Sequence, residues 1–297
     1  MTTTSSRRNT AKSAPLTHRS LVAVVAVVGL VAGCGNGDGD GDAVPRSEIG
    51  HVHDLIVDED ALLVATHRGL LRLDDGSYRR IGAEVHDLMA MTRDPSGDIV
   101  ASGHPDLRLE QYRVGGAPSF LGLARSPDDG QTWEILSLLG EADFHAIVPN
   151  ETGLLAGDST GTIWRFDPDG DGQPVGSIPF DINDLAVSPD NAAAVVATSY
   201  EGDVAVSDDA GQTWKLQQGA PLITEIEWTI DGVLGATVDG ELWAAASPAG
   251  PFERVGDVPG EVEALLVSDD RVWAATHGGQ IYRQENDSWT PLVRSDD

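Results

Sequence analysis

The stretch VEALLVSDDRVWAAT, residues 262–276, contains the pattern that decides the fold. An apolar strand start is followed by an acidic turn and then by a second strand that ends in Ala-Thr. The same order of features recurs along the chain, for the most part at a spacing of about 40 residues. First strands are expected to start at Val52, Val85, Phe144, Ile182, Ile223 and Val262, and second strands to end at Thr66, Ser102, Gly157, Thr198, Thr237 and Thr276.

This repeat predicts an all-β protein, a β-propeller of four-stranded antiparallel blades, because each such unit buries its faces only against its neighbours. No segment after the N-terminal region has a sustained helical period. The six repeats predict six blades, and a seventh would follow if the residues from Ala43 to Ile49 completed another strand. We expect the propeller domain to span residues 49–297.

Two segments contain the sharper motif S-x-D-x-G-x-T-W, which predicts a hairpin between the third and fourth strands of a blade. In such a hairpin Asp accepts backbone N–H groups, Gly takes a positive φ and Trp packs into the blade. The motif resembles the Asp-box (BNR) repeat of sialidase-like propellers, where it is a structural element of the outer turns. The motif residues are Ser126, Asp128, Gly130 and Trp133 in one segment, and Ser207, Asp209, Gly211 and Trp214 in the other.

The mature chain also resembles bacterial lipoproteins that are described as BNR-repeat or glycosyl-hydrolase-like. The segments that carry this likeness are 50–53 (GHVH), 102–106 (SGHPD) and 139–145 (LGEADFH). The resemblance implies a sialidase-like glycoside hydrolase as one alternative, with Tyr200 beside Glu201 at the rim as the best-placed tyrosine. The arginine motif of sialidases is missing, and Val44-Pro45-Arg46-Ser47 is the nearest stretch. A protein-binding or assembly role, similar to photosystem assembly factors and sortilin-like receptors, is the other alternative.

The N-terminal region predicts export. Residues 1–33 combine a basic stretch, an apolar run from Leu21 to Val31 that is too short to span a bilayer comfortably, and small residues before the only cysteine. Val31-Ala32-Gly33-Cys34 resembles the lipobox of bacterial lipoproteins, which implies lipidation at Cys34 and a location on the outer face of the cytoplasmic membrane. An ordinary secreted protein is the alternative, and the export route stays open. Residues 34–48 are expected to be a flexible acidic Gly/Asp linker.

The charge balance narrows the range of partners. The chain has 48 acidic and 19 basic residues and a formal net charge of −29. So acidic a protein is a poor partner for nucleic acid and for anionic lipid headgroups. A small ligand, a glycan or a protein remains as partner, besides the membrane reached through Cys34, and we expect a monomer.

All seven histidines of the mature chain fall at one edge of the expected propeller. In a meander the start of the first strand and the end of the second lie at the same edge, because the chain runs out and comes back. Imidazole together with carboxylate suits zinc, copper, iron or nickel, so this rim predicts a ligand site and, more narrowly, a transition-metal site. Polar side chains that line a wet channel are the alternative. The candidate ligands are His51, His53, His67, His86, His104, His145, His277, Asp106 and Glu141.

Three further features of the sequence give weaker indications of structure or function. The insertion from Pro105 to Phe120 is long enough to act as a lid over the histidine edge. The segment 167–172, DPDGDG, has the acidic spacing of a calcium loop, but Ile178 occupies the position of the closing Glu, so calcium is not expected. Met89 and Met91 are expected in the core.

Overall fold

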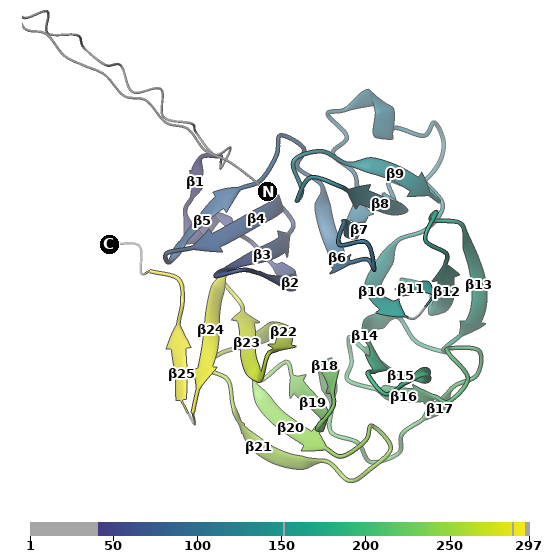
Figure 1. Ribbon diagram of the computed structural model, residues 1–297, viewed down its shortest axis with the longest axis vertical. Coiled ribbons are helices and arrows are strands. Elements are labelled where there is room, and N and C mark those ends of the chain that lie inside the picture. The colour runs from purple at the N-terminus through teal and green to yellow at the C-terminus, as the bar shows by residue number, and fades with distance from the viewer. Residues whose placement is uncertain (1–40, 151, 287, 295–297) are drawn as a thin grey trace, which may run out of the picture. The chain divides into compact units, whose positions relative to one another are not determined.

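The computed structural model describes residues 41–150, 152–286 and 288–294, which form six antiparallel sheets arranged in a ring (Figure 1). The expected signal sequence, Cys34 and the linker up to residue 40 lie outside the described residues. Among the described residues, no helix is both long and apolar enough to cross a bilayer. The all-β propeller of six four-stranded blades is therefore confirmed.

Each blade is a meander of four consecutive strands, and its first strand is innermost (Figure 1). Blade 1 is β2 (Val52–Asp58), β3 (Ala61–Thr66), β4 (Gly69–Asp74) and β5 (Ser77–Arg80); blade 2 is β6 (Asp87–Arg93), β7 (Ile99–His104), β8 (Leu123–Ser126) and β9 (Glu134–Ser137); blade 3 is β10 (Phe144–Asn150), β11 (Gly153–Asp158), β12 (Thr162–Phe166) and β13 (Gly172–Ser177). Blade 4 is β14 (Ile182–Ser188), β15 (Asn191–Ser199), β16 (Val204–Ser207) and β17 (Lys215–Leu216); blade 5 is β18 (Ile223–Thr229), β19 (Gly232–Thr237), β20 (Glu241–Ala245) and β21 (Glu253–Asp257); blade 6 is β22 (Val262–Ser268), β23 (Arg271–Thr276), β24 (Gln280–Glu285) and β25 (Ser288–Pro291).

A short strand at the N-terminus decides between six and seven blades. Strand β1 (Ala43–Val44) pairs with β5 and forms a fifth strand on the outside of blade 1, followed by the 3-10 turn η1 (Arg46–Glu48). The alternative of a seventh blade is therefore wrong. The linker was expected to extend to residue 48, but residues 43–48 belong to the folded domain because their backbone is hydrogen-bonded in sheet and turn.

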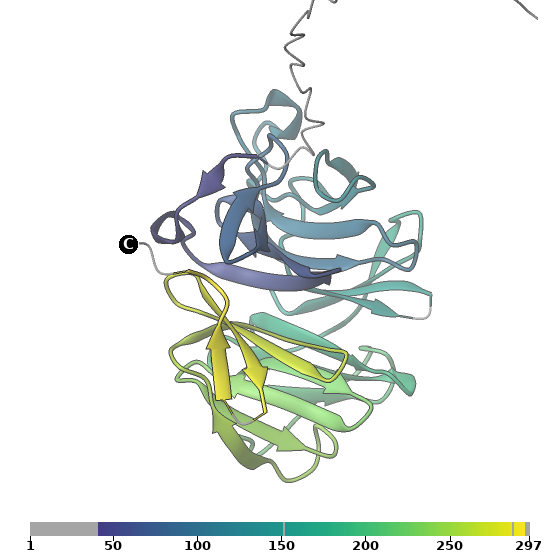
Figure 2. The ribbon, with the colours of Figure 1, turned by 60° about the vertical axis from the view of Figure 1, so that its left-hand side comes forward.

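The first and the last blade lie side by side (Figure 2), and side-chain packing between them closes the ring. Val52, Leu71 and Tyr78 of blade 1 share one apolar core with Trp273 and Ile281 of blade 6. The buried hydroxyl of Tyr78 donates a 3.0 Å hydrogen bond to the backbone oxygen of Gly279. Similar apolar clusters fill the other spaces between neighbouring blades, as expected for units that bury their faces only against one another.

A β-bulge occurs at the same place in the innermost strand of all six blades. The pairing register skips one residue between first and second strand, which turns the skipped residue towards one mouth of the ring. The six skipped residues are His53, Met89, His145, Asn183, Thr224 and Glu263. They are equivalent positions of the repeat.

The bulges show that the expected alignment of blade 2 with the other repeats is wrong. Its strand register matches Leu88-Met89-Ala90, three residues after the expected start Val85-His86-Asp87-Leu88. Met89 therefore lies at the mouth and not in the core, whereas Met91 is buried as expected. The likeness of His86-Asp87-Leu88 to His53-Asp54-Leu55 misled the alignment, because backbone pairing sets the register of a strand and a three-residue match does not.

The two S-x-D-x-G-x-T-W segments form nearly identical hairpins between the third and fourth strands. Ser126 Oγ accepts the Gly130 N–H at 2.7 Å, and Asp128 accepts the Thr132 N–H at 2.9 Å. In blade 4 the corresponding bonds, Gly211 N–H to Ser207 and Thr213 N–H to Asp209, measure 3.0 and 2.8 Å. The Trp133 and Trp214 rings pack against apolar clusters. The acidic turn at 167–172 is likewise a hydrogen-bonded hairpin, in which Asp167 accepts the N–H groups of Asp169 and Asp171.

Candidate functional site

The bulge residues surround a cavity at one mouth of the propeller. All six line it, together with His51, Tyr200 and Val238, and its volume is about 120 Å³. A larger cavity of about 370 Å³ runs along the innermost strands and shares His53, His145, Asn183 and Glu225 with the mouth cavity. Since the bulges place one side chain from every blade at this opening, the mouth is where the repeat can assemble a site.

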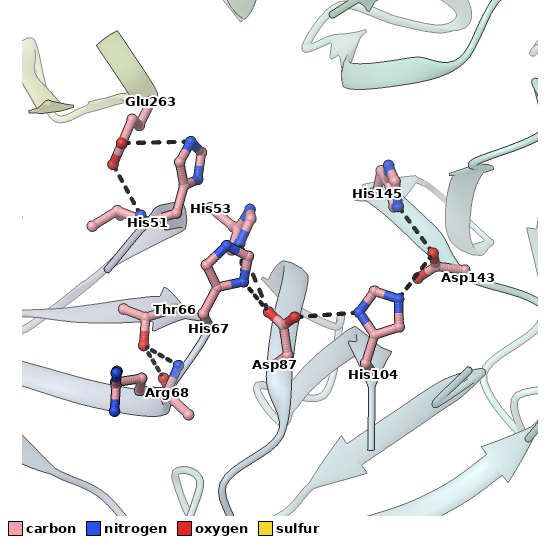
Figure 3. Close-up of polar contacts among 12 residues, drawn as sticks. His51, His53, Thr66, His67, Arg68, Asp87, His104, Asp143, His145 and Glu263 are labelled. Atoms are coloured by element: carbon pink, nitrogen blue, oxygen red, sulfur yellow. Dashed lines mark hydrogen bonds and ion pairs between the residues drawn. The ribbon is translucent and has the colours of Figure 1, made fainter. Parts of the chain in front are cut away.

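Three histidines and one carboxylate converge at the side of the mouth that blades 1 and 2 form (Figure 3). One ring nitrogen from each of His51, His53 and His67 lies within 4.8 Å of the others. Nε2 of His53 lies 3.2 Å from Nδ1 of His67, and Oδ1 of Asp87 lies 2.7 Å from the His67 nitrogen and 3.8 Å from the His53 nitrogen. Donors of a tetrahedral zinc site with bonds of about 2.1 Å are separated by roughly 3.4 Å. The spacing of these atoms therefore needs only small side-chain shifts to suit a metal.

The protons of this cluster cannot satisfy all of its contacts. Nδ1 of His67 has a single in-plane site, which holds either a hydrogen or a lone pair. Its short contact with the Asp87 carboxylate requires the hydrogen to point at that oxygen. Nε2 of His53, 3.2 Å away, is then left without a well-directed partner on His67. A cation at the point of convergence would accept a lone pair from both imidazoles and from the carboxylate.

Electrostatics favour the metal-binding protonation states. Burial, aided by His51 and His67, lowers the pKa of His53 to about 3, and burial also lowers the pKa of His51. Although burial opposes it, hydrogen bonds from His104 and His67 hold the pKa of Asp87 below its ordinary value. Neutral imidazoles beside an ionised carboxylate are the forms that coordinate transition metals.

A chain of polar contacts continues from Asp87 across blades 2, 3 and 4. Oδ2 of Asp87 lies 3.3 Å from Nδ1 of His104, whose other ring nitrogen lies 3.6 Å from Oδ2 of Asp143 (Figure 3). The same Asp143 oxygen is 3.1 Å from Nε2 of His145, and Nδ1 of His145 is 2.9 Å from the Tyr200 hydroxyl. Asp143 is buried, and its Oδ1 has no hydrogen-bond partner among the described residues. The contact with Asp87 raises the pKa of His104.

Glu263 connects the opposite side of the cluster to the last blade. Its carboxylate accepts the Val52 N–H at 3.0 Å and lies 2.9 Å from Nδ1 of His277 and 3.5 Å from Nε2 of His51. Nδ1 of His51 is buried and has no hydrogen-bond partner among the described residues. His277 is 73% exposed at its side chain, so it borders the mouth without entering the cluster.

Besides His104, His145 and His277, three further predicted ligands lie apart from the cluster. His86 is only 1% exposed, faces Glu84 at 2.8 Å and accepts the Asp106 N–H at 3.0 Å. Asp106 pairs with Arg108 at 2.6 Å, which holds the pKa of that carboxyl well below its usual range. Glu141 is exposed on a turn. The structure does not bring these three residues into the cluster, because contacts local to the insertion orient His86 and Asp106.

The insertion is anchored beside blade 2 and is not the lid that its length suggested. Tyr112, in the 3-10 turn η2 (Glu110–Tyr112), is buried in the core between blades 1 and 2, and its hydroxyl lies 2.5 Å from Glu84. The His86 ring packs edge-on against Tyr112 at 4.8 Å. Figure 1 shows the insertion outside the ring. His86 and Asp106 are thus residues that hold this segment.

The sequence interpretation missed several mouth residues. Met89, Asn183, Thr224 and Glu263 have no chemical feature in common, so a search by residue type passes over them. Their signal is positional: each is the residue that the β-bulge skips in the first strand of its blade.

Beneath the mouth, four carboxyl groups that are partly or fully buried line the channel. Burial raises the pKa of Asp54 and of Asp184 to about 7, and it raises those of Glu225 and Glu227 well above the ordinary value. The carboxylates of Asp54 and Asp184 accept backbone N–H groups of the following blades. These groups are therefore part of the propeller's interior hydrogen bonding.

Many solved structures share the fold, and the three that follow are distant in sequence. No family model matches the chain, and no curated protein matches it. A gluconolactonase from Xanthomonas campestris has a TM-score of 0.61 at 12% identity, with 80% of this chain and 86% of that chain covered. Virginiamycin B lyase from Staphylococcus aureus has a TM-score of 0.57 at 10% identity over 85% and 87%. The WD40 propeller domain of Doa1 has a TM-score of 0.60 at 12% identity over 86% of each chain. At these identities the likeness shows the fold alone: the chain is a six-bladed β-propeller.

Proposed function

We propose that the protein is a transition-metal-binding β-propeller, tethered through lipid on Cys34 to the outer face of the cytoplasmic membrane. The metal site consists of His53, His67 and Asp87, with His51 as the fourth donor. The observation that carries the proposal is the convergence of one ring nitrogen from each of His51, His53 and His67 within 4.8 Å of one another, beside the Asp87 carboxylate. Three imidazoles and one carboxylate suit zinc first, and also copper, iron or nickel.

The glycoside hydrolase alternative has less support. Among the described residues that line the mouth cavity none is Arg or Lys, so nothing there corresponds to the arginines that hold the carboxylate in sialidases. Burial raises the pKa of Tyr200, and nearby carboxylates raise it further, which disfavours the phenolate of a nucleophile. For an assembly scaffold, no feature of the described residues specifies a protein partner.

Metal analysis of the untagged mature domain tests the proposal. We expect close to one equivalent of metal after exposure to Zn²⁺ and dialysis, and one binding event when Zn²⁺ is titrated into the metal-free protein. The double variant His53→Ala/His67→Ala should lose this binding. His277→Ala is the matched control, because its exposed ring faces Glu263 and lies outside the cluster, and it should bind zinc like the parent.

Two results would contradict the proposal. One is the absence of any stoichiometric metal in the parent protein after exposure to zinc, copper, iron and nickel salts in turn. The other is unchanged zinc binding in His53→Ala/His67→Ala. Circular dichroism of each variant checks that the sheet content is retained, so that a loss of binding reports on the ligands.

A further inference from the structure

The mouth of the propeller has two chemically different sides. Imidazoles and carboxylates border it on blades 1, 2, 3 and 6. Blades 4 and 5 contribute one carboxylate, Glu225, and three large apolar side chains that stand exposed. These are Tyr200, Leu222 and Val238, which are 49%, 68% and 52% exposed. Eight large hydrophobic side chains are exposed among the described residues. Three of the eight border the mouth on blades 4 and 5, and we call these three the apolar arc.

The apolar arc is continuous with the site. Tyr200 follows β15, Leu222 precedes β18 and Val238 follows β19, so all three are at the mouth edge of their blades. The backbone of Leu222 lies against Gly202, close to Tyr200. Tyr200 and Val238 line the same cavity as His51 and His53. A ligand in this cavity would therefore touch both sides at once.

The size of the cavity limits what enters it. An apolar cavity of roughly 150 Å³ holds a molecule such as benzene. The mouth cavity has about 120 Å³, enough for a polar head group with part of one ring. The remainder of a ligand would lie over the exposed arc, where apolar surface of this kind marks a binding region.

The charge around the cavity determines the head group. Glu225 and Glu263 line the cavity, and no Arg or Lys does so among the described residues. An anionic head group therefore finds only one cationic partner at this mouth, the metal held by His53, His67 and Asp87. Oxygen donors such as carboxylate or hydroxamate coordinate such a metal directly, here in place of His51, because four protein donors leave a tetrahedral metal no open position.

We infer that the ligand is a small molecule with an oxygen-donor head that coordinates the metal and an aromatic or alkyl body that packs on Tyr200, Leu222 and Val238. This inference rests on the proposed metal site and names the class of ligand for it. Metal and apolar contacts act together, so neither half of the molecule binds well alone.

Two hydroxamates of different size test the inference on the zinc-loaded mature domain. Acetohydroxamate has the coordinating head without an aromatic body, and benzohydroxamate adds one ring. We expect benzohydroxamate to bind roughly tenfold more tightly by calorimetry, about the gain that burial of one aromatic ring gives. Tyr200→Ala/Val238→Ala should abolish this difference and leave acetohydroxamate binding and zinc content unchanged.

Ile230→Ala serves as the matched control. Ile230 is 68% exposed in the turn between β18 and β19, at the opposite edge of blade 5, and its replacement should leave the tenfold preference intact. Equal affinities of the two hydroxamates for the zinc-loaded parent would overturn the inference while the metal site stands. A parent protein that holds no metal would overturn both.

Discussion

The carboxylate of Asp184 in blade 4 accepts a hydrogen bond of 2.7 Å from the backbone N–H of Ile226 in blade 5. Asp54 makes the equivalent bond of 2.8 Å to the N–H of Met91 in blade 2, and Glu227 accepts the N–H of Val267 in blade 6 at 3.2 Å. Each contact joins the innermost strands of two neighbouring blades. Interior carboxylates thus connect blades that otherwise meet through apolar side chains.

Replacement of Asp184 should weaken the propeller. Asp184→Ala leaves the N–H groups of Leu185 and Ile226 without their acceptor, and an unsatisfied buried donor costs about 1–3 kcal/mol. We expect the free energy of unfolding, measured by urea denaturation at pH 5, to fall by this amount. Asp60→Ala, in an exposed turn, is the control and should change it by less than about 0.5 kcal/mol. A loss of stability no larger than that of the control would contradict the role assigned to Asp184.

The same carboxyl groups make the folding stability of the protein depend on pH. The folded-state pKa of Asp184 is raised to about 7, whereas an unfolded Asp titrates near 4. The folded state therefore keeps a proton that the unfolded state loses, and stability decreases as pH rises from about 4 to 7. The raised pKa values of Glu225 and Glu227 act in the same direction.

The lowered pKa values of His51, His53 and His86 act in the opposite direction over the same pH range. We therefore compare the metal-free parent with Asp184→Asn by urea unfolding at pH 5 and pH 8, and we expect the parent to lose about 1–4 kcal/mol more stability between the two values. The variant should lose less, because the amide does not ionise. The lowered pKa of Asp209 affects a range below pH 4 and does not enter this comparison. The same pH dependence in the parent and in Asp184→Asn would show that Asp184 ionises without penalty.

The hairpin motifs should affect stability and not binding. Asp209→Ala removes the acceptor of the Thr213 N–H and hydroxyl, and we expect a loss of about 1–2 kcal/mol in the free energy of unfolding. Gly211→Ala should lower the free energy of unfolding more than a neutral substitution does. Gly211 has a φ of +83°, and a Cβ there would lie 2.9 Å from Ile163. Zinc affinity should match that of the parent in both variants. A selective loss of zinc binding would assign the motif a functional role that its contacts do not suggest.

Substitutions of two histidines should show that zinc binding and folding stability depend on different residues. His86→Ala removes a buried ring that holds the insertion and should destabilise the domain by about 2–4 kcal/mol, with one equivalent of zinc still bound. His67→Ala removes a half-exposed ring and should do the reverse: near-parental stability without metal, and much weaker zinc binding. Urea unfolding of metal-free protein and zinc titration check the pair. The opposite pattern would place the site at His86.

Membrane attachment should depend on one sulfur atom. Cys34 is the only cysteine of the chain, and the proposed lipid anchor has no second attachment point there. Cys34→Ser should move the protein from the membrane fraction to the soluble extracytoplasmic fraction and abolish the incorporation of labelled palmitate. Continued membrane attachment of Cys34→Ser would contradict the lipoprotein proposal.

The sequence by itself determined the propeller, its six repeats, the hairpin motifs and the edge at which most histidines lie. These properties depend on local patterns: strand alternation, turn residues at fixed offsets and a period near 40 residues. The chain therefore encodes them within each repeat, and the order of the strands in a meander follows from that. The placement of His53, His145 and His277 at one edge needed no further information.

Only the tertiary structure decided which of those residues converge. A bulge adds one residue without a sequence signature, so the register of blade 2 placed Met89 at the mouth and His86 in the core. The contact between Glu263 and the Val52 N–H joins positions 211 residues apart and exists only because the ring closes. The raised pKa values in the channel likewise depend on burial by all the blades together. Distances between side chains of different repeats follow from how the blades pack, and no single repeat contains that information.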